Sequence, residues 1–453
     1  MTEGASYAVT VADHPAIQAC VVDDGAGTIA GGDVTDVVVR CDAKVFFRAD
    51  DGTGCEPYLT DGTAAGTLRL ADIHPTGSSG CADDLDSDGV PHRLGDKLVF
   101  AATDPTHGLE LWITDGTTQG TSLIADVSPG PAAGALTWMA VFDGAVYGRG
   151  PGGELWSTDG TAAGTGLVAD VNPNGQAAVS SLTTFGSELY FAATSAGVRQ
   201  VWKTDGTAAG TVVALSAPQP SNIISIPMAV DGTTLYYSSG TFSDRELFAS
   251  DGTDPGSVSL DLDPAGATNP SQLLAVGGTL FYRGIAAGLG VELYVTDGTL
   301  AGTSVIDVAP GPTTSFPNPL GTFGGQLVFT STEGLWLLVA NQPTPLYSSS
   351  TVSDDLLITS SRIYFQGEDA SGGNELWTSD GTMAGTSRLA DIEPGPESSF
   401  PFQLAKLPND DTAFFIASTA AAGAEPWRSD GTEAGTQLIL DINPGPAGST
   451  GDD

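Results

Sequence analysis

Residues 110–121 read Glu-Leu-Trp-Ile-Thr-Asp-Gly-Thr-Thr-Gln-Gly-Thr, and versions of this phrase occur nine times along the 453-residue chain. Two further clean copies start at Glu154 and Glu375, and a worn copy surrounds Trp336. Variants start at Glu56, Gln200, Glu246, Glu292 and Glu425. The copies are about 45 residues apart, a period that indicates a repeat architecture.

Each repeat predicts four short β-strands. In the unit spanning residues 136–171, alternating apolar residues and turn residues predict strands over 136–142, 145–148, 154–158 and 166–171. Four strands in 40–50 residues are typical of one blade of a β-propeller. We expect the first strand to be innermost and Asp-Gly-Thr to join the third strand to the fourth. The loops between the second and third strands then share one face with the crossovers to the next blade, and we call it the crossover face.

The number of third strands predicts an all-β propeller of nine blades over residues 34–445, with eight blades plus a docked edge unit as the alternative. Residues 34–40 are expected to supply the innermost strand of the first blade. The ring is expected to close blade against blade, without exchange of strands between the ends. Residues 446–453 are expected to form a C-terminal tail.

Aromatic residues fill one position on the second strand and one on the third strand of every unit. The second-strand set is Phe47, Phe100, Tyr147, Phe191, Tyr237, Tyr282, Phe329, Phe365 and Phe415, and the third-strand set is Tyr58, Trp112, Trp156, Trp202, Phe248, Tyr294, Trp336, Trp377 and Trp427. Such regularity favours packing between blades, because large periodic aromatics usually bury apolar area. Nine sugar-stacking platforms are the alternative interpretation.

The charge of the chain restricts its partners. Asp and Glu number 55 against 15 Lys and Arg, which gives a formal net charge of −40. Such a surface repels phosphate backbones and anionic lipids, so we expect no nucleic-acid partner. No apolar run is long enough to insert into a membrane. Cations, basic proteins and neutral glycans remain compatible with this charge.

Four cysteines indicate an oxidising, extracellular compartment. They form no CxxC pair, and the four histidines show no zinc-ligand spacing, so we predict two disulfides among Cys20, Cys41, Cys55 and Cys81. Cys55 and Cys81 both fall on the crossover face of the first blade, which makes a disulfide between them plausible. The first residues lack a basic and an apolar leader region, which favours a chain cut from a longer secreted precursor over another export route.

An acidic loop gives the sharpest local signal for a ligand. Residues 84–89 read Asp-Leu-Asp-Ser-Asp-Gly, the spacing with which a calcium loop opens. The predicted Ca²⁺ ligands are three carboxylates and one backbone carbonyl, those of Asp84, Asp86, Asp88 and Val90. The position that would carry the bidentate Glu of an EF-hand is Gly95. The alternative is a solvated acidic loop without a metal.

Two further sets of carboxylates recur. A Glu starts the third strand and an Asp ends the fourth, as Glu110 and Asp126 do. One interpretation is that each pair binds a cation or shares a proton. The other, which we favour, is that the Glu holds the loop between the second and third strands and the Asp caps the turn that follows the fourth strand. The Asp of each Asp-Gly-Thr turn, such as Asp115, is interpreted as a cap for backbone N–H groups, with the Gly at positive φ.

The phrase Glu-Leu-Trp-x-x-Asp-Gly-Thr resembles the bacterial ELWxxDGT-repeat proteins over residues 44–445. This resemblance implies a large secreted or surface-attached protein and no established catalytic residue. The turn also resembles the Asp-box of sialidase propellers, where it is structural. Residues 1–33 resemble the tail of a small β-sandwich repeat of secreted bacterial proteins, which implies that Cys20 pairs with Cys41.

The predicted function is a non-catalytic binding or adhesion module at the cell surface or outside the cell. It would be a monomer that binds a protein or glycan ligand on its crossover face, with support from Ca²⁺. Candidate contact segments break the repeat pattern at residues 223–226, 315–317 and 399–401. The alternatives are a structural spacer in a large surface protein and a glycan-directed enzyme. The chain contains no GxSxG, HExxH or phosphate-binding glycine loop.

Overall fold

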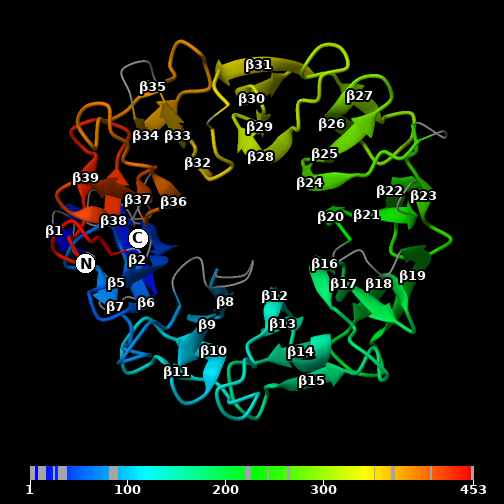
Figure 1. Cartoon of the computed structure of the whole chain (residues 1–453), viewed down its shortest axis with the longest axis horizontal. Coiled ribbons are helices and arrows are strands. Elements are labelled where there is room, and N and C mark those ends of the chain that lie inside the picture. The colour runs from blue at the N-terminus through cyan, green and yellow to red at the C-terminus, as the bar shows by residue number, and fades with distance from the viewer. Residues whose placement is uncertain are drawn as a thin grey trace.

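The computed structural model describes residues 6–8, 17–23, 26–28, 38–80, 90–219, 226–241, 244–262, 266–350, 352–368, 373–408 and 411–449. Nine antiparallel sheets are arranged in a ring around a central opening (Figure 1). The chain is therefore a nine-bladed β-propeller. The prediction of nine blades is confirmed, and the alternative of eight blades plus a docked unit is wrong.

The innermost strands of eight blades line the central opening (Figure 1). They are β8 (His92–Leu94), β12 (Thr137–Phe142), β16 (Ser180–Phe185), β20 (Met228–Asp231), β24 (Ser271–Val276), β28 (Asn318–Phe323), β32 (Leu356–Ile358) and β36 (Phe402–Lys406). The second strands are β5 (Val45–Asp50), β9 (Lys97–Asp104), β13 (Ala145–Arg149), β17 (Glu188–Ser195), β21 (Thr234–Thr241), β25 (Thr279–Ala286), β29 (Gln326–Ser331), β33 (Ile363–Glu368) and β37 (Ala413–Thr419).

The third and fourth strands lie farther from the opening. The third strands are β6 (Cys55–Thr60), β10 (Gly108–Thr114), β14 (Leu155–Thr158), β18 (Val198–Thr204), β22 (Asp244–Ser250), β26 (Gly290–Thr296), β30 (Gly334–Val339), β34 (Asn374–Ser379) and β38 (Gly423–Ser429). The fourth are β7 (Leu68–Arg69), β11 (Ser122–Leu123), β15 (Gly166–Ala169), β19 (Val212–Gln219), β23 (Val258–Ser259), β27 (Ser304–Ile306), β31 (Gln342–Tyr347), β35 (Ser387–Arg388) and β39 (Gln437–Leu438).

The described helical structure is a single 3₁₀ turn, η1 (Pro151–Gly153). Across the described ranges, no helix has the length and apolar character needed to cross a membrane.

The first blade differs from the other eight. Its sheet contains only β5, β6 and β7 among the described residues, whereas each of the other eight blades has four strands. The prediction that residues 34–40 supply its innermost strand is wrong for residues 38–40. They belong to β4 (Val38–Ala43), which pairs with β2 (Gln18–Asp23) instead of with β5.

Two small ladders precede the propeller. β1 (Ser6–Ala8) pairs with β3 (Ala26–Thr28), and β2 pairs with β4. Cys20 and Cys41 lie directly opposite each other in the β2–β4 ladder. Opposite residues of an antiparallel ladder have Cα separations within the range that a disulfide spans, so this register is compatible with the predicted Cys20–Cys41 pair.

The two aromatic positions of a blade face each other across the ladder between its second and third strands. Phe100 lies opposite Trp112, and Tyr282 opposite Tyr294, whose ring centroids are 4.9 Å apart. The third blade departs from the expected alignment, because Trp156 lies opposite Gly148 and Tyr147 is shifted by one residue. The second-strand aromatics are nearly fully buried, which supports their interpretation as core residues.

Apolar clusters fill the spaces between neighbouring blades. Between the third and fourth blades, Tyr147 and Leu155 pack with Leu189 and Phe191. The last and first blades pack in the same way, and the rings of Phe47 and Phe414 are 5.2 Å apart. The ring therefore closes through blade-to-blade packing, as the sequence predicted.

Candidate ligand-binding face

The polar groups of each Asp-Gly-Thr turn bond to one another. Asp115 Oδ1 accepts the N–H of Thr117 at 2.9 Å and its hydroxyl at 2.7 Å, while Thr117 Oγ1 accepts the N–H of Gly120 at 2.9 Å. The Thr117 hydroxyl is the main reason why the pKa of Asp115 lies below its ordinary value. The intervening Gly116 has a φ of 93°. This pattern supports the structural interpretation of the turn.

The crossover face is anchored by seven buried glutamates at the start of third strands: Glu56, Glu110, Glu154, Glu246, Glu292, Glu375 and Glu425. Glu375 accepts the N–H of Ile392 at 2.9 Å and that of Ser399 at 3.1 Å, and the Ser399 hydroxyl at 2.6 Å. Burial raises the pKa of the Glu375 carboxyl, and these donors oppose that shift. The glutamates therefore hold the crossover to the next blade rather than the loop that the sequence favoured.

A buried residue in several of the described crossovers links one blade to the next. The Ser399 N–H bonds Glu375, and the Ser399 carbonyl accepts the N–H of Ser418 in β37 at 2.7 Å. Ser315 makes equivalent bonds to Glu292 and to Thr332, which follows β29. Because hydrogen bonds fix both its N–H and its carbonyl group, the φ angle of the residue that follows is constrained.

The residue after this buried link adopts a left-handed backbone. Positive φ angles occur at equivalent positions in five crossovers, at Gly80, Ala178, Asn269, Phe316 and Phe400. Gly and Asn tolerate this region, whereas a bulky side chain there is an outlier. Phe316 and Phe400, with φ of 46° and 44°, are therefore strained, and each side chain is 53% exposed.

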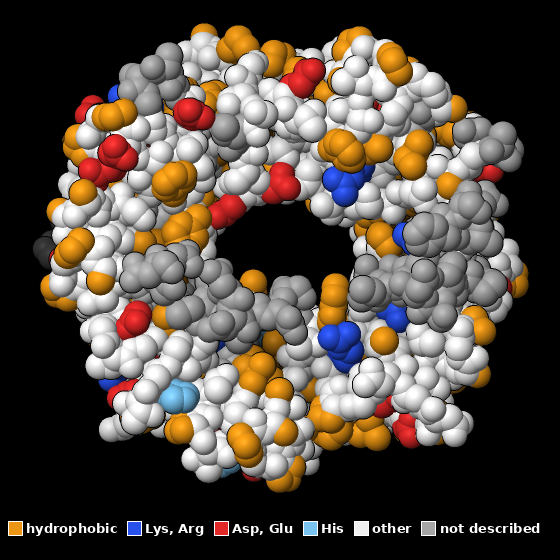
Figure 2. All heavy atoms as spheres, in the orientation of Figure 1, with side chains coloured by type: hydrophobic (Ala, Val, Ile, Leu, Met, Phe, Trp, Pro, Cys, Tyr) orange, Lys and Arg blue, Asp and Glu red, His pale blue; other side chains and the backbone are white. Residues whose placement is uncertain are grey.

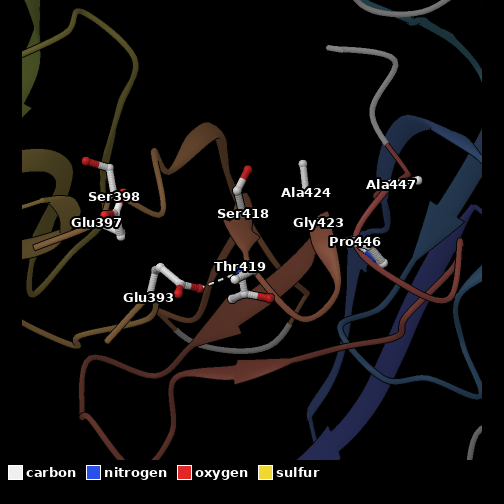
Figure 3. A pocket seen from close by; sticks show the side chains of 10 residues that line it. Glu393, Glu397, Ser398, Ser418, Thr419, Gly423, Ala424, Pro446 and Ala447 are labelled. Atoms are coloured by element: carbon white, nitrogen blue, oxygen red, sulfur yellow. Dashed lines mark hydrogen bonds between the residues drawn. The ribbon is translucent and has the colours of Figure 1, made fainter. Parts of the chain in front are cut away.

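A groove whose lining includes Ser398, two residues before Phe400, hollows the crossover face (Figure 3). Its volume is about 440 Å³, and it lies between the crossover that follows β35 and the loop that joins β37 to β38. Glu393 spans part of it and accepts the N–H of Ala420 at 2.7 Å. The rest of its polar lining includes Glu397, Ser398, Ser418 and Thr419. Carboxylates and hydroxyls of this kind can accept hydrogen bonds from a polar ligand.

The central opening carries a second hollow, which the sequence did not indicate. It has a volume of about 550 Å³ and is lined by residues of five blades, among them Trp138, Ser181 and Gln272 of innermost strands and Arg283 of the second strand β25. The first three have positive φ angles of 51–56°. Basic side chains lie on the rim over β12–β13 and β24–β25 (Figure 2). These inner strands share no motif, so only the fold brings them together.

The predicted calcium loop and one predicted disulfide lie partly outside the described residues. Asp84, Asp86, Asp88 and Cys81 are outside, while Val90 is described and is 67% exposed. No group of three or more His, Cys, Asp or Glu placed to hold a metal occurs in the described part. Ser79 donates its N–H to the Cys55 carbonyl at 2.8 Å, which brings the segment that leads to Cys81 beside Cys55. The calcium site and the disulfide stay predictions.

The candidate contact segments have different outcomes. Residues 223–225 lie outside the described residues, and Ile226 is buried in the core between the fourth and fifth blades. The prediction of an exposed contact is therefore wrong for Ile226. The prediction is also wrong for Ser315, Pro317, Ser399 and Pro401, which are buried, whereas Phe316 and Phe400 are exposed on the crossover face.

No protein-family model and no curated protein matches this chain. Among solved structures, the computationally designed Ika8 protein is 12% identical, with a TM-score of 0.43 over 72% of this chain and 92% of that one. Puromycin hydrolase is 11% identical, with a TM-score of 0.41 over 80% and 53% of the two chains. A prolyl endopeptidase is 15% identical, with a TM-score of 0.42 over 77% and 48%. The match spans about half the length of these two enzymes.

Proposed function

We propose that this chain is a non-catalytic ligand-binding module of the extracellular space or cell surface, and that its ligand docks on the crossover face. The observation that carries the proposal is the pair Phe316 and Phe400. Each is a half-exposed aromatic in a left-handed backbone, at a position where three other crossovers have Gly, Ala or Asn. A strained residue that does not fill the core is a candidate for function, because its cost to folding is not offset by packing.

The surroundings of Phe400 favour a neutral glycan as ligand. Aromatic faces pack against apolar faces of a ligand, and the groove that begins two residues earlier in the same crossover supplies carboxylate and hydroxyl oxygens from Glu393, Glu397 and Ser398 that can accept hydrogen bonds from sugar hydroxyls. The formal charge of −40 disfavours anionic ligands. Resemblance to the ELWxxDGT-repeat proteins supports secretion or surface attachment, and Ca²⁺ at Asp84–Asp88 is proposed as a support of the same face.

A glycan array tests this proposal directly. The purified chain should bind neutral glycans, and the double variant Phe316→Asn/Phe400→Asn should lose about tenfold or more of this binding, because aromatic contacts dominate such surfaces. Both substitutions introduce Asn, which tolerates the left-handed backbone better than Phe, so the fold should persist.

The matched control changes two exposed apolar side chains at the Asp-Gly-Thr end. Leu300→Asn/Met383→Asn removes side chains that are 48% and 54% exposed, and it should leave glycan binding unchanged. Equal loss in both double variants, or capture of a basic protein without any glycan signal, would contradict a glycan site at Phe316 and Phe400.

A further inference from the structure

A β-bulge recurs on four innermost strands. In β12, β16, β24 and β36, two residues stand opposite a single residue of the second strand. The first residue of each bulge has a positive φ, and these residues are Trp138, Ser181, Gln272 and Gln403. The bulges of β12, β16 and β24 line the hollow at the central opening.

The bulge of β36 shows what its backbone can bind. The N–H groups of Gln403 and Leu404 both donate to the carboxylate of Asp355, that of Leu404 at 3.2 Å. Asp355 belongs to the preceding blade, where it comes directly before β32. Burial raises the pKa of the Asp355 carboxyl, and both N–H groups oppose that shift. Successive N–H groups that point to one anion form a nest, so this bulge favours a charged carboxylate.

The bulge of β24 has the same geometry as that of β36. Its flanking residues Ser271 and Leu274 pair with the second strand in the same register. Gln272 has a φ of 51°, against 53° for Gln403. The N–H groups of Gln272 and Leu273 therefore have the orientation that binds a carboxylate in β36, and both residues line the hollow.

A proline holds the position of Asp355 beside the β24 bulge. Asp355 precedes the residue opposite Phe365, the second-strand aromatic of its blade. Pro227 precedes the residue opposite Tyr237, the equivalent aromatic, and it lines the hollow. Residues 220–226, which lead to Pro227, contain neither Asp nor Glu. At this position the preceding blade therefore offers a side chain that cannot accept a hydrogen bond.

A guanidinium group adjoins the same bulge. Arg283 lines the hollow and donates its Nε–H to Ser271 Oγ at 3.1 Å, directly before Gln272. Within the described ranges, Arg283 takes part in no ion pair. A guanidinium has five N–H donors, so those on its two Nη atoms can pair with a carboxylate.

We propose that the central hollow binds a small carboxylate ligand. Its carboxylate accepts the N–H groups of Gln272 and Leu273, as Asp355 does in β36, and Arg283 supplies the opposite charge. The site is separate from the crossover face and does not depend on the ligand proposed there.

The size and lining of the hollow suit a sugar acid. Its volume of about 550 Å³ lies within the range of small-molecule sites, about 300–1,000 Å³. Ser181 and Thr183 bring hydroxyl groups to the lining, and Trp138 brings an aromatic ring. The formal charge of −40 does not prevent binding, because exposed charges more than about 8 Å away are largely screened at physiological ionic strength.

Glucuronate and its methyl ester are the matched probes. They share the same ring, and only the acid carries a carboxylate. Saturation-transfer NMR of the full chain should show saturable binding of glucuronate with a Kd of about 1 mM or lower. The ester should bind at least about tenfold more weakly, because it loses the charge-assisted hydrogen bonds.

Two variants at one position place the carboxylate in the β24 bulge. Pro227→Asp puts a carboxylate where Asp355 stands in the other blade, so it should fill the site and weaken glucuronate binding about tenfold or more. Pro227→Asn removes the same proline without adding a charge and should keep binding within about twofold. Thermal unfolding checks that both variants fold, and the Asp variant should be the more stable of the two.

A second pair of variants tests the guanidinium. Arg283→Gln should weaken glucuronate binding about fivefold or more, because the ligand loses its opposite charge. Arg388→Gln removes the same charge from the outer strand β35 and should leave binding unchanged. Equal loss in the two variants would assign the effect to the net charge and contradict the site.

Three further outcomes would overturn the proposal. The first is equal binding of glucuronate and its methyl ester. The second is unchanged glucuronate binding in Pro227→Asp. The third is binding that appears only after Asp83, Asp84, Asp86 and Asp88 are changed to Asn, which would assign the bulge to the chain's own acidic loop.

Discussion

The two ends of each blade have diverged to different degrees. At the Asp-Gly-Thr end, eight turns contain the same aspartate, and its carboxylate is occupied by the hydroxyl and N–H of the following Thr, as at Asp115, Asp297 and Asp380. At the crossover end, the buried glutamate is common, yet the residue that follows the linking residue varies from the buried Gly80 to the exposed Phe400. A repeat that fixes one end and varies the exposed part of the other leaves the second end available for recognition.

The largest effect should come from removing a crossover anchor. Glu375→Ala leaves the donors of Ile392 and Ser399 without their acceptor in a buried site, and should lower the free energy of unfolding by about 4 kcal/mol. Urea unfolding measures this loss. Glu433→Ala, at an exposed position in an Asp-Gly-Thr turn, should change it by less than about 0.5 kcal/mol. A small effect of Glu375→Ala would show that the Glu375 carboxylate does not anchor the crossover.

A smaller loss is expected at the Asp-Gly-Thr end. A Cβ added to Gly120 would lie 2.0 Å from Asp115 Oδ1, so Gly120→Ala must displace the carboxylate that holds the turn and should cost about 2 kcal/mol. Gly166→Ala is the matched control, because its added Cβ meets nothing within 4 Å. Equal unfolding curves for the two variants would mean that the uniform turn does not require its glycine.

A gain in stability, instead of a loss, is expected at the crossover end. Phe316→Asn relieves a left-handed backbone and should raise the free energy of unfolding by about 1 kcal/mol. Leu300→Asn, an equally exposed change at the other end, should be nearly neutral. A loss of stability in Phe316→Asn would show that the exposed phenyl ring contributes to the fold, which would weaken its assignment to a ligand.

The smallest expected effect is a change in the pKa of an aspartate at the Asp-Gly-Thr end. In Thr117→Val, the pKa of Asp115 should rise toward its ordinary value of 3.8, because the Thr117 hydroxyl is the main cause of its low pKa. A folded-state pKa below the unfolded one contributes stability that is present above the unfolded pKa and lost as pH falls through the folded pKa. The variant should therefore lose less stability on acidification than the parent chain. Carboxyl NMR titration checks the pKa, and an unchanged value would contradict this role of Thr117.

The sequence determined the repeat, the four-strand blade and the number of blades, because a long phrase with two aromatic positions recurs at nearly constant spacing. In the unit around Trp156, the predicted strands agree with β12–β15 within two residues. The sequence also identified Phe316 and Phe400 as departures from the pattern. It did not show that their backbone is left-handed, since this follows from the bonds of Ser315 and Ser399 to two blades at once.

Only the tertiary structure decided what happens in the first blade and at the central opening. Residues 38–40 read as an innermost strand, because their alternation suits any strand, yet pairing with β2 rather than β5 depends on contacts distant in sequence. The hollow around Trp138, Ser181 and Gln272 likewise combines residues from separate blades. Local sequence sets the propensity of a strand and the chemistry of a turn, whereas the choice of neighbour is made by packing and ring closure.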